Sequence, residues 1–347
     1  MKRCIIMISI ILSGITMISF DVKSALGAVV SDSSADAGPL KVIKTFTVGG
    51  GPGGFDYLKV DSQEHRLYLS HSNRVMVIDT INGKPIGEIT DTPGVHGIAL
   101  VPDCNVGFTS NGRENTLSVF DLKKLKLLRK IKSGQNPDSI IYDPASKKVF
   151  AFNGRSGDIT IVDPTALDKE PVTLPVGGKL ETGVSDLAGH VYVNVENKNE
   201  IVSIDSKNSK VLAHWPLAPG EEPTGMAIDR EHHRLFAGCS NKMMVILDAN
   251  DGKVLATVPI GSGVDGVTFD QQLGLAISSN GRDGTLTAVK EESNGTFKVV
   301  QTLKTARGAR TITSDPKSHL IYLPCNIEAD VQNQFSVLVV GAITTKL

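Results

Sequence analysis

Seven polar residues recur along this sequence at intervals of 40 to 45 positions, and their side chains could hold a charged ligand. They are Asp56, His96, Asp138, Glu181, Thr224, Asp265 and Arg310. Carboxylate and imidazole groups bind divalent cations, and a guanidinium group binds carboxylates through paired hydrogen bonds. Crowded carboxylates also raise one another's pKa, which suits proton transfer. If the fold gathers these residues, they predict a site for a small zwitterionic or anionic ligand, or for a metal ion held by Asp56, His96, Asp138 or Asp265.

A second set of cations recurs with the same spacing. Three copies of Asn-Gly-Arg supply Arg113, Arg155 and Arg282, and the shorter segment Ser70–Arg74 supplies His71. The Asn and Gly residues have a structural explanation, because both tolerate positive φ and an Asn side chain can tie a loop to a neighbouring strand. A turn does not require the arginines, so we expect the arginines and His71 to form a basic rim around the first set.

The elements that would position these residues follow a period near 42. An Asp ends the expected third strand of successive units at Asp79, Asp121, Asp163, Asp205 and Asp248, with Lys290 at the next place. Seven second strands can be aligned in the same way, from Arg66-Leu-Tyr-Leu to Leu320-Ile-Tyr-Leu. This period is typical of four-stranded propeller blades. It predicts an all-β, seven-bladed β-propeller with antiparallel blades, whereas a β-sandwich would not produce seven equal repeats.

The two ends of the repeat region predict how the ring closes. The seventh unit ends with the strand Phe335–Val340 and has no convincing fourth strand, while residues 41–48 alternate as a strand without a unit of their own. We therefore expect this N-terminal strand to complete the last blade. The predicted domains are a signal peptide (1–27), a disordered lead-in (28–40), the propeller (41–341) and a C-terminal tail (342–347).

Hairpin connectivity places the two polar sets on one face. The start of each first strand and the loop after each second strand lie at the same end of a blade. The seven residues would then surround the mouth of the central channel, with the arginines at its rim. A channel mouth is also wet, so polar residues there are compatible with a merely solvated channel.

Several segments resemble the bacterial YncE-like, YVTN-type β-propeller family. The resemblance covers roughly residues 41–341 and is carried by Pro223–Asp229, Arg234–Cys239, Val245–Asp248, Gly177–Glu181 and Arg307–Arg310. It implies a secreted or periplasmic seven-bladed propeller without a settled common reaction. The chain has a single Trp and no Gly-His…Trp-Asp signature, so it does not read as a WD40 protein.

The N-terminus predicts export. A basic start precedes the apolar run from Ile5 to Phe20, and Ala25-Leu-Gly27 follows, which is typical of a Sec-type signal peptide cleaved near Gly27. An uncleaved membrane anchor is the alternative. Without residues 1–27 the chain has 33 Lys+Arg against 36 Asp+Glu. This balance leaves no excess of positive charge with which to bind nucleic acid or acidic membranes. No other apolar run is long enough to span a bilayer.

Three cysteines remain after cleavage: Cys104, Cys239 and Cys325. An odd number without a Cys-x-x-Cys pair is not a disulfide framework. We therefore expect three buried or half-buried thiols.

Two functions from different classes fit these observations. The first is a periplasmic or secreted, monomeric, non-catalytic platform that binds a small ligand or a cell-envelope protein at the channel mouth and needs no cofactor. The second is a lactonase- or hydrolase-like enzyme in which a divalent cation at the acidic ring polarises a carbonyl. A third possibility is haem binding, as in the d1 propellers of nitrite reductases, but these propellers resemble this chain only in the expected fold.

Overall fold

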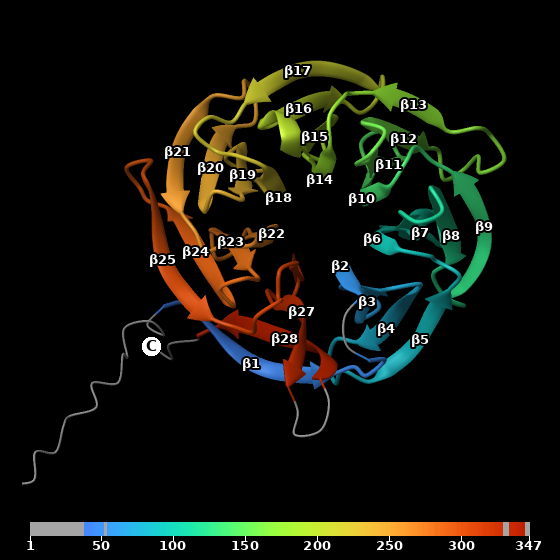
Figure 1. Ribbon diagram of the computed structural model, residues 1–347, viewed down its shortest axis with the longest axis horizontal. Helices are drawn as coiled ribbons and strands as arrows, with labels where there is room; N and C mark the ends of the chain where they lie inside the picture. The colour runs from blue at the N-terminus through green and yellow to red at the C-terminus, as the bar shows by residue number, and fades with distance from the viewer. Residues whose placement is uncertain (1–37, 52–53, 329–332, 344–347) are drawn as a thin grey trace, which may run out of the picture. The chain divides into compact units, whose positions relative to one another are not determined.

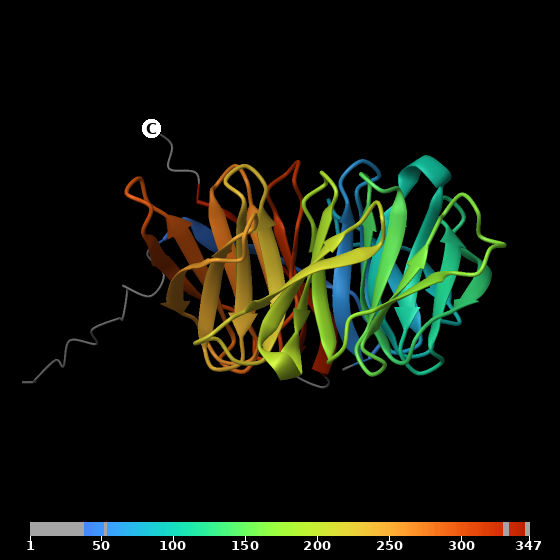
Figure 2. The same cartoon turned by 90° about the horizontal axis from the view of Figure 1, so that it is seen from above.

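Seven four-stranded antiparallel sheets surround a central channel in the computed structural model, which describes residues 38–51, 54–328 and 333–343 (Figure 1). In the side view, the strands cross the thickness of the ring and the turns gather at its two faces (Figure 2). The predicted seven-bladed β-propeller is therefore confirmed. The proposed signal peptide, most of the lead-in and the last four residues lie outside the described part of the chain.

Each blade begins at the channel and proceeds outward. The inner strands are β2 (Phe55–Asp61), β6 (Val95–Val101), β10 (Pro137–Asp143), β14 (Leu180–Ser185), β18 (Pro223–Asp229), β22 (Val264–Asp270) and β26 (Thr313–Ser314). The second strands are β3 (Arg66–His71), β7 (Val106–Asn111), β11 (Lys148–Asn153), β15 (His190–Val195), β19 (Arg234–Cys239), β23 (Leu275–Asn280) and β27 (Ile321–Glu328).

The third and fourth strands complete the blades. The third strands are β4 (Arg74–Asp79), β8 (Thr116–Asp121), β12 (Asp158–Val162), β16 (Glu200–Asp205), β20 (Met243–Asp248), β24 (Thr285–Glu291) and β28 (Asn333–Ala342). The outer strands are β5 (Pro85–Thr90), β9 (Lys126–Lys132), β13 (Val172–Pro175), β17 (Lys210–Pro216), β21 (Val254–Pro259), β25 (Phe297–Lys304) and, for the seventh blade, β1 (Leu40–Thr47). Single 3-10 turns, η1 (Pro102–Cys104) and η2 (Glu196–Lys198), lie in the second and fourth blades.

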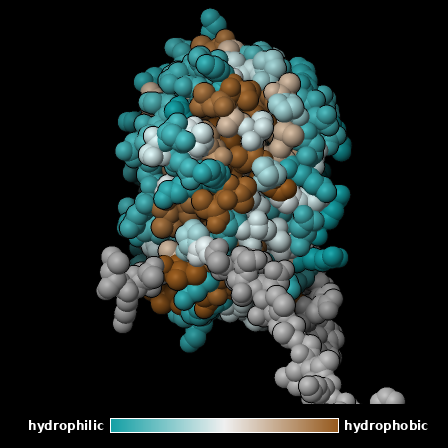
Figure 3. Space-filling model, turned by 90° about the vertical axis from the view of Figure 1, so that its left-hand side faces the viewer, coloured by the Kyte–Doolittle hydropathy of each residue, from teal (hydrophilic) through white to brown (hydrophobic). Residues whose placement is uncertain are grey.

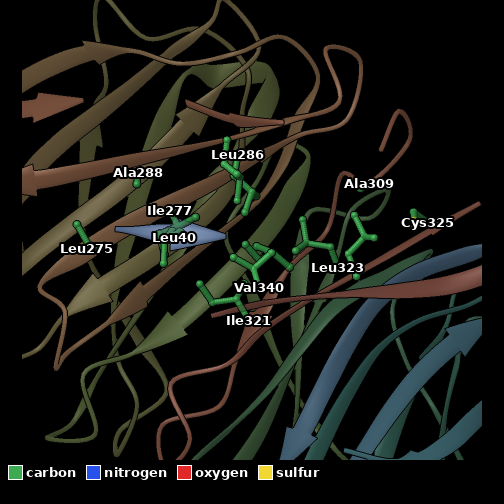
Figure 4. Packing of buried hydrophobic residues seen from close by; sticks show 13 residues of the cluster. Leu40, Leu275, Ile277, Leu286, Ala288, Ala309, Ile321, Leu323, Cys325 and Val340 are labelled. Carbon is green, nitrogen blue, oxygen red and sulfur yellow. The ribbon is translucent and has the colours of Figure 1, made fainter. Parts of the chain in front are cut away.

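The closing strand β1 pairs antiparallel with β28, as the sequence predicted. Its two buried side chains face different neighbours. Leu40 packs in a cluster with the sixth blade, including Leu275 and Ile277 (Figure 4), while Phe46 packs in a cluster with strands of the first blade. The buried side chain of Gln301 adds two hydrogen bonds to the Leu40 backbone, of 2.9 and 2.8 Å. A single strand thus joins the last blade to both of its neighbours.

The recurring aspartates stabilise the turns between third and fourth strands. Asp79 Oδ1 accepts hydrogen bonds from the backbone N–H groups of Ile81 and Asn82, at 2.8 and 3.0 Å. Asp121 Oδ1 accepts two in the same way, from Lys123 and Lys124. A short acceptor that satisfies its own turn explains why Asp marks this point of the repeat.

The outer strands leave alternate side chains in solvent. The side of the ring that carries β21, β25 and β1 shows apolar patches interrupted by polar ones (Figure 3). Leu255, Val299, Val42 and Ile43 on these strands are exposed, as expected when an outer strand packs with one face only. Among the described residues, no helix is long and apolar enough to cross a membrane.

The three cysteines are free thiols. Cys239 and Cys325 are buried and Cys104 is half-buried, as predicted. Burial raises the pKa of Cys239 to about 12 and that of Cys325 to about 11. Neither thiol is therefore an effective nucleophile near neutral pH.

Candidate functional site

Six of the seven predicted ligand-binding positions coincide with a backbone irregularity. In six blades the pairing of the inner strand with the second strand shifts register at this point, for example between Phe55 and Leu58 and between Val95 and Ile98. The other four shifts flank Asp138, Glu181, Thr224 and Asp265. A bulge frees one residue from the ladder and redirects its side chain. The bulges therefore turn the ring residues toward the channel.

Hydroxyl groups of neighbouring blades fix this backbone. Ser110, which precedes an Asn-Gly-Arg segment, donates a short hydrogen bond to the carbonyl oxygen of Asp138. Ser279 makes the same contact with Arg310 in the next blade, and Thr311 Oγ1 donates to the carbonyl oxygen of Asp56 at 2.7 Å. These three ring residues are thus each held by a blade other than their own.

His96 lies between two carboxylates at the channel mouth. Its Nδ1 is 2.6 Å from Asp56 Oδ2 and 3.8 Å from Asp138 Oδ1, and one ligand atom from each of the three residues lies within 4.8 Å of the others. Burial works against protonation of His96, but the hydrogen bond to Asp56 and the charge of Asp138 raise its pKa above the ordinary value. Burial also raises the pKa of Asp138 to about 6. The group can therefore hold either a proton or a cation.

Arg310 joins the acidic group to the neighbouring Asp265. Its Nη2 lies 3.6 Å from Asp56 Oδ1, and its Nε lies 2.8 Å from Asp265 Oδ2. Burial, followed by the charge of Asp56, raises the pKa of Asp265 to about 7. Asp265 does not belong to the three-residue cluster that could hold a metal, so the structure supports three of the four predicted metal ligands as a group.

The remaining two ring residues have structural partners. Glu181 pairs with Lys179 at 2.9 Å, and burial together with the charge of Asp138 raises the pKa of Glu181. Lys179 also pairs with Glu196. Thr224 donates its hydroxyl hydrogen to the carbonyl oxygen of Val264 at 2.9 Å, so it contributes to the backbone of the ring.

Two rim arginines line the same cavity as the acidic group. This cavity has a volume of about 460 Å³, and its walls include Asp56, His96, Arg310, Arg113 and Arg155. Within the described residues, neither Arg113 nor Arg155 forms an ion pair with a carboxylate. Two accessible guanidinium groups of this kind have the donors that an anion would need.

The structure places the other two rim residues elsewhere. Arg282 lines an adjacent cavity, which it shares with Arg310. His71 was expected at the rim, but its side chain is only 5% exposed. Its ring packs against Phe335 at 4.9 Å between centroids, and its Nε2 lies 3.2 Å from the carbonyl oxygen of Gly51. Gly51 and Phe335 therefore cover His71, which corrects the predicted rim.

The Asn-Gly-Arg loops confirm one structural prediction and correct another. The Asn side chains are buried and tie the loop to the third strand, as in the 2.9 Å hydrogen bond from Asn111 Nδ2 to Ser118 Oγ. However, neither Asn nor the following Gly adopts positive φ. The left-handed residue comes four places after the Asn, at Asn115, Gly157 and Gly284.

Gly112 is required for close packing with the site. A Cβ atom at this position would lie 2.7 Å from His96 Nε2 and 2.7 Å from Asn136 Oδ1. We expect Gly112→Ala to displace the His96 ring from Asp56 while destabilising the fold by only about 1–2 kcal/mol. The measurement is the pKa of His96 by NMR, which should fall toward its ordinary value.

The matched control is Gly154→Ala, at the same place in the next blade. Its Cβ would meet the carbonyl oxygen of Leu180 at 3.1 Å and no atom of His96. An unchanged His96 titration in Gly112→Ala would show that the glycine does not set the position of the ring.

Sequence analysis missed several residues of the site. Tyr57 follows Asp56, and its hydroxyl oxygen lies 3.1 Å from Thr182 Oγ1, so the two side chains form a floor across the channel. Lys179 lies one residue outside β14, where no repeat marks it. Asn115 and Asn136 also line the cavity. Alignment of the repeats finds positions that recur, and Tyr57 and Lys179 have no counterparts in the other blades.

The fold and this site define the class of protein as a seven-bladed β-propeller with an acidic channel mouth and accessible arginines at its rim. No protein-family model matches the chain, and no curated protein is similar in sequence. Among solved structures, the chain is similar to the crystal structure of RRP9 WD40 repeats, with a TM-score of 0.73 and 7% sequence identity. The match covers 87% of this chain and 99% of that one. At this identity the likeness concerns the fold alone.

Proposed function

We propose that this protein is a non-catalytic binding platform that holds a small anionic or zwitterionic ligand at the channel mouth. The observation that carries the proposal is one cavity whose walls hold Asp56 and His96 together with Arg113 and Arg155, two arginines that form no ion pair within the described residues. The arginines supply the donors for a carboxylate, and the carboxylates supply acceptors for an ammonium group. A rigid ring also preorganises these groups, which lowers the cost of binding.

The polar wall distinguishes this site from an ordinary solvated channel. Asp56 already has partners within the protein, because Arg310 and His96 lie 3.6 and 2.6 Å from its oxygens. Arg113 and Arg155 therefore add positive charge that the protein does not neutralise locally. An incoming carboxylate would contact them without displacing an existing ion pair.

Titration calorimetry with succinate, phosphate and glutamate tests this proposal. We expect at least one of these probes to bind, and the double variant Arg113→Met/Arg155→Met to bind it at least tenfold more weakly. Arg129→Met on the outer strand β9 is the matched control, because it removes an exposed guanidinium away from the cavity. Binding of none of the three probes, or equal binding by the double variant, contradicts the proposal.

A metal-assisted hydrolase, of the lactonase kind, is the second candidate. It is favoured by the spacing of Asp56, His96 and Asp138, whose ligand atoms lie within 4.8 Å of one another. Two carboxylates and one imidazole would leave positions open for water and for a substrate carbonyl, and a cation there would act as a Lewis acid. Arg113 and Arg155 would then orient an anionic substrate.

Elemental analysis before and after chelation decides between the two candidates. A stoichiometric divalent ion that is lost in His96→Ala and Asp138→Ala, together with lactone hydrolysis, would support the enzyme. Asp103→Asn, an exposed carboxylate in η1, is the control. A metal-free protein whose melting temperature does not change in chelator would exclude this candidate.

We also propose that the chain is exported and belongs to the YncE-like group of propellers. The support is the basic and apolar N-terminal segment and the repeat segments already named, such as Arg234–Cys239. N-terminal sequencing of the protein from the cell envelope tests export. We expect the mature chain to begin near Ala28, and recovery of the protein with residues 1–27 from the cytoplasm would contradict it.

A further inference from the structure

A second chamber occupies the channel on the far side of the Tyr57–Thr182 contact. This contact joins opposite sides of the ring, from β2 to β14, at 3.1 Å. Below it lies a cavity of about 360 Å³ lined by inner-strand residues of all seven blades. Its polar character differs from that of the first cavity, because its charged lining residues are the two cations Lys59 and Arg230.

Lys59 and Arg230 approach this chamber from different blades. Lys59 lies near the middle of β2, and Arg230 follows the end of β18. Neither side chain forms an ion pair within the described residues, although Arg230 Nε donates a hydrogen bond to the carbonyl oxygen of Ser185 at 3.1 Å. Both side chains are exposed to solvent in the channel, and partial desolvation by the surrounding protein, followed by the charge of Arg230, lowers the pKa of Lys59. The two cations are therefore near enough to repel each other, and no carboxylate of the described residues pairs with either of them.

The carboxylates at this end of the channel are engaged in turns. Asp61 Oδ1 accepts hydrogen bonds from two backbone N–H groups, at 3.0 and 3.1 Å. Asp186 Oδ1 accepts three, from Ala188, Gly189 and His190. Asp229 accepts from Glu231 and from the ring of His232. Asp186 and Asp229 are close enough to stabilise the charge on Arg230, but their oxygens are held by the turns.

We propose that this chamber is a second binding site, specific for a small organic anion with an apolar body, whose carboxylate lies between Lys59 and Arg230. The anion would replace the missing counterion and relieve the repulsion between the two cations. The partly exposed side chains of Ile141, Val184 and Phe269 line the chamber and would contact the apolar part of the ligand. Apolar walls with a few convergent polar groups are the usual composition of a small-molecule site.

The two ends of the channel would then take different ligands. The first cavity presents carboxylates together with arginines, so it suits a ligand that carries both charges. The second presents cations and apolar walls, so it suits an anion without an ammonium group. The contact between Tyr57 and Thr182 lies between the two sites, and no residue lines both cavities, so the sites can be tested independently.

Calorimetric titration with hexanoate, acetate and hexylamine tests this inference. We expect hexanoate to bind at least tenfold more tightly than acetate, which lacks the apolar body, and hexylamine not to bind. Lys59→Met and Arg230→Met, which remove the charge but keep an unbranched side chain, should each weaken hexanoate binding at least tenfold. The double variant Arg113→Met/Arg155→Met should leave it unchanged, so that failure here is distinguishable from failure at the first cavity.

If these variants do not fold, a measurement on the wild-type protein still tests the inference. Bound carboxylate should raise the pKa of Lys59, so hexanoate binding near pH 9 should take up protons, measured as a dependence of the heat on the buffer used. Three results would each overturn the inference: no binding at about 10 mM hexanoate, equal binding of hexanoate and hexylamine, or retention of hexanoate by Lys59→Met together with loss in Arg113→Met/Arg155→Met.

Discussion

Replacing Phe46 with alanine is expected to lower the free energy of unfolding by about 3–5 kcal/mol. Phe46 is 4% exposed and lies in the closing strand β1. It packs with first-blade residues such as Leu58 and last-blade residues such as Val337, and a Cβ atom on Gly83 would lie within 2.3 Å of its ring. Alanine would leave a cavity at the junction where the chain closes the ring.

Urea denaturation followed by circular dichroism measures this effect. Val42→Ala is the control in the same strand, because Val42 is 38% exposed and its truncation should cost less than about 0.5 kcal/mol. Similar losses for the two variants would show that pairing with β28, and not the Phe46 anchor, holds the closing strand.

The architecture could be predicted because repetition amplifies weak signals. Each blade offers only short alternating strands, but seven copies with the same Asp at the turn fix the period. The closing strand followed from counting strands. Its burial did not follow, because only Leu40 and Phe46 are buried in β1 and a bulge interrupts the alternation after Val42. An outer strand contacts its neighbours at its ends, which a period of two does not encode.

The candidate site was predicted in position but not in detail. Hairpin connectivity was sufficient to bring Asp56, His96 and Asp138 to one end of the channel. It could not reveal that bulges aim these side chains, since a bulge depends on pairing with the second strand. It also misplaced His71, because the cover over that side chain comes from the segment around Gly51 and from Phe335, both distant in the repeat alignment. A contact that only one blade makes does not appear when the repeats are aligned, so it could not be predicted in this way.

Asp265→Asn is expected to make the protein less sensitive to alkaline pH. Burial raises the pKa of Asp265 to about 7 from an ordinary value of 3.8. Below both values the carboxyl group is neutral in the folded and the unfolded chain, so it contributes no pH dependence. As the pH rises from about 4 to 7, the unfolded chain loses its proton first, and the folded state becomes progressively less stable.

The variant should therefore be closest to the wild type in stability near pH 4 and exceed its stability at pH 8. The side chain of Asp265 is 27% exposed, so solvent screens part of the effect, and we expect a gain on the order of 2 kcal/mol at pH 8. Asparagine keeps an oxygen that can accept the hydrogen bond from Arg310 Nε. Urea midpoints from pH 4 to pH 8, measured with chelator present, give the comparison.

His96 acts in the same direction, which makes the comparison with the variant necessary. The raised pKa of His96 gives stability that is present below its ordinary pKa of 6.5 and is lost as pH rises through the higher folded-state value. Both proteins contain His96, so the difference between their pH profiles isolates Asp265, and Asp103→Asn controls for the loss of a carboxylate from the surface. If the wild type gains stability relative to Asp265→Asn as the pH rises, the 2.8 Å ion pair with Arg310 outweighs burial. The channel mouth would then hold Asp265 as a permanent anion, and its ligand would have to be correspondingly more cationic.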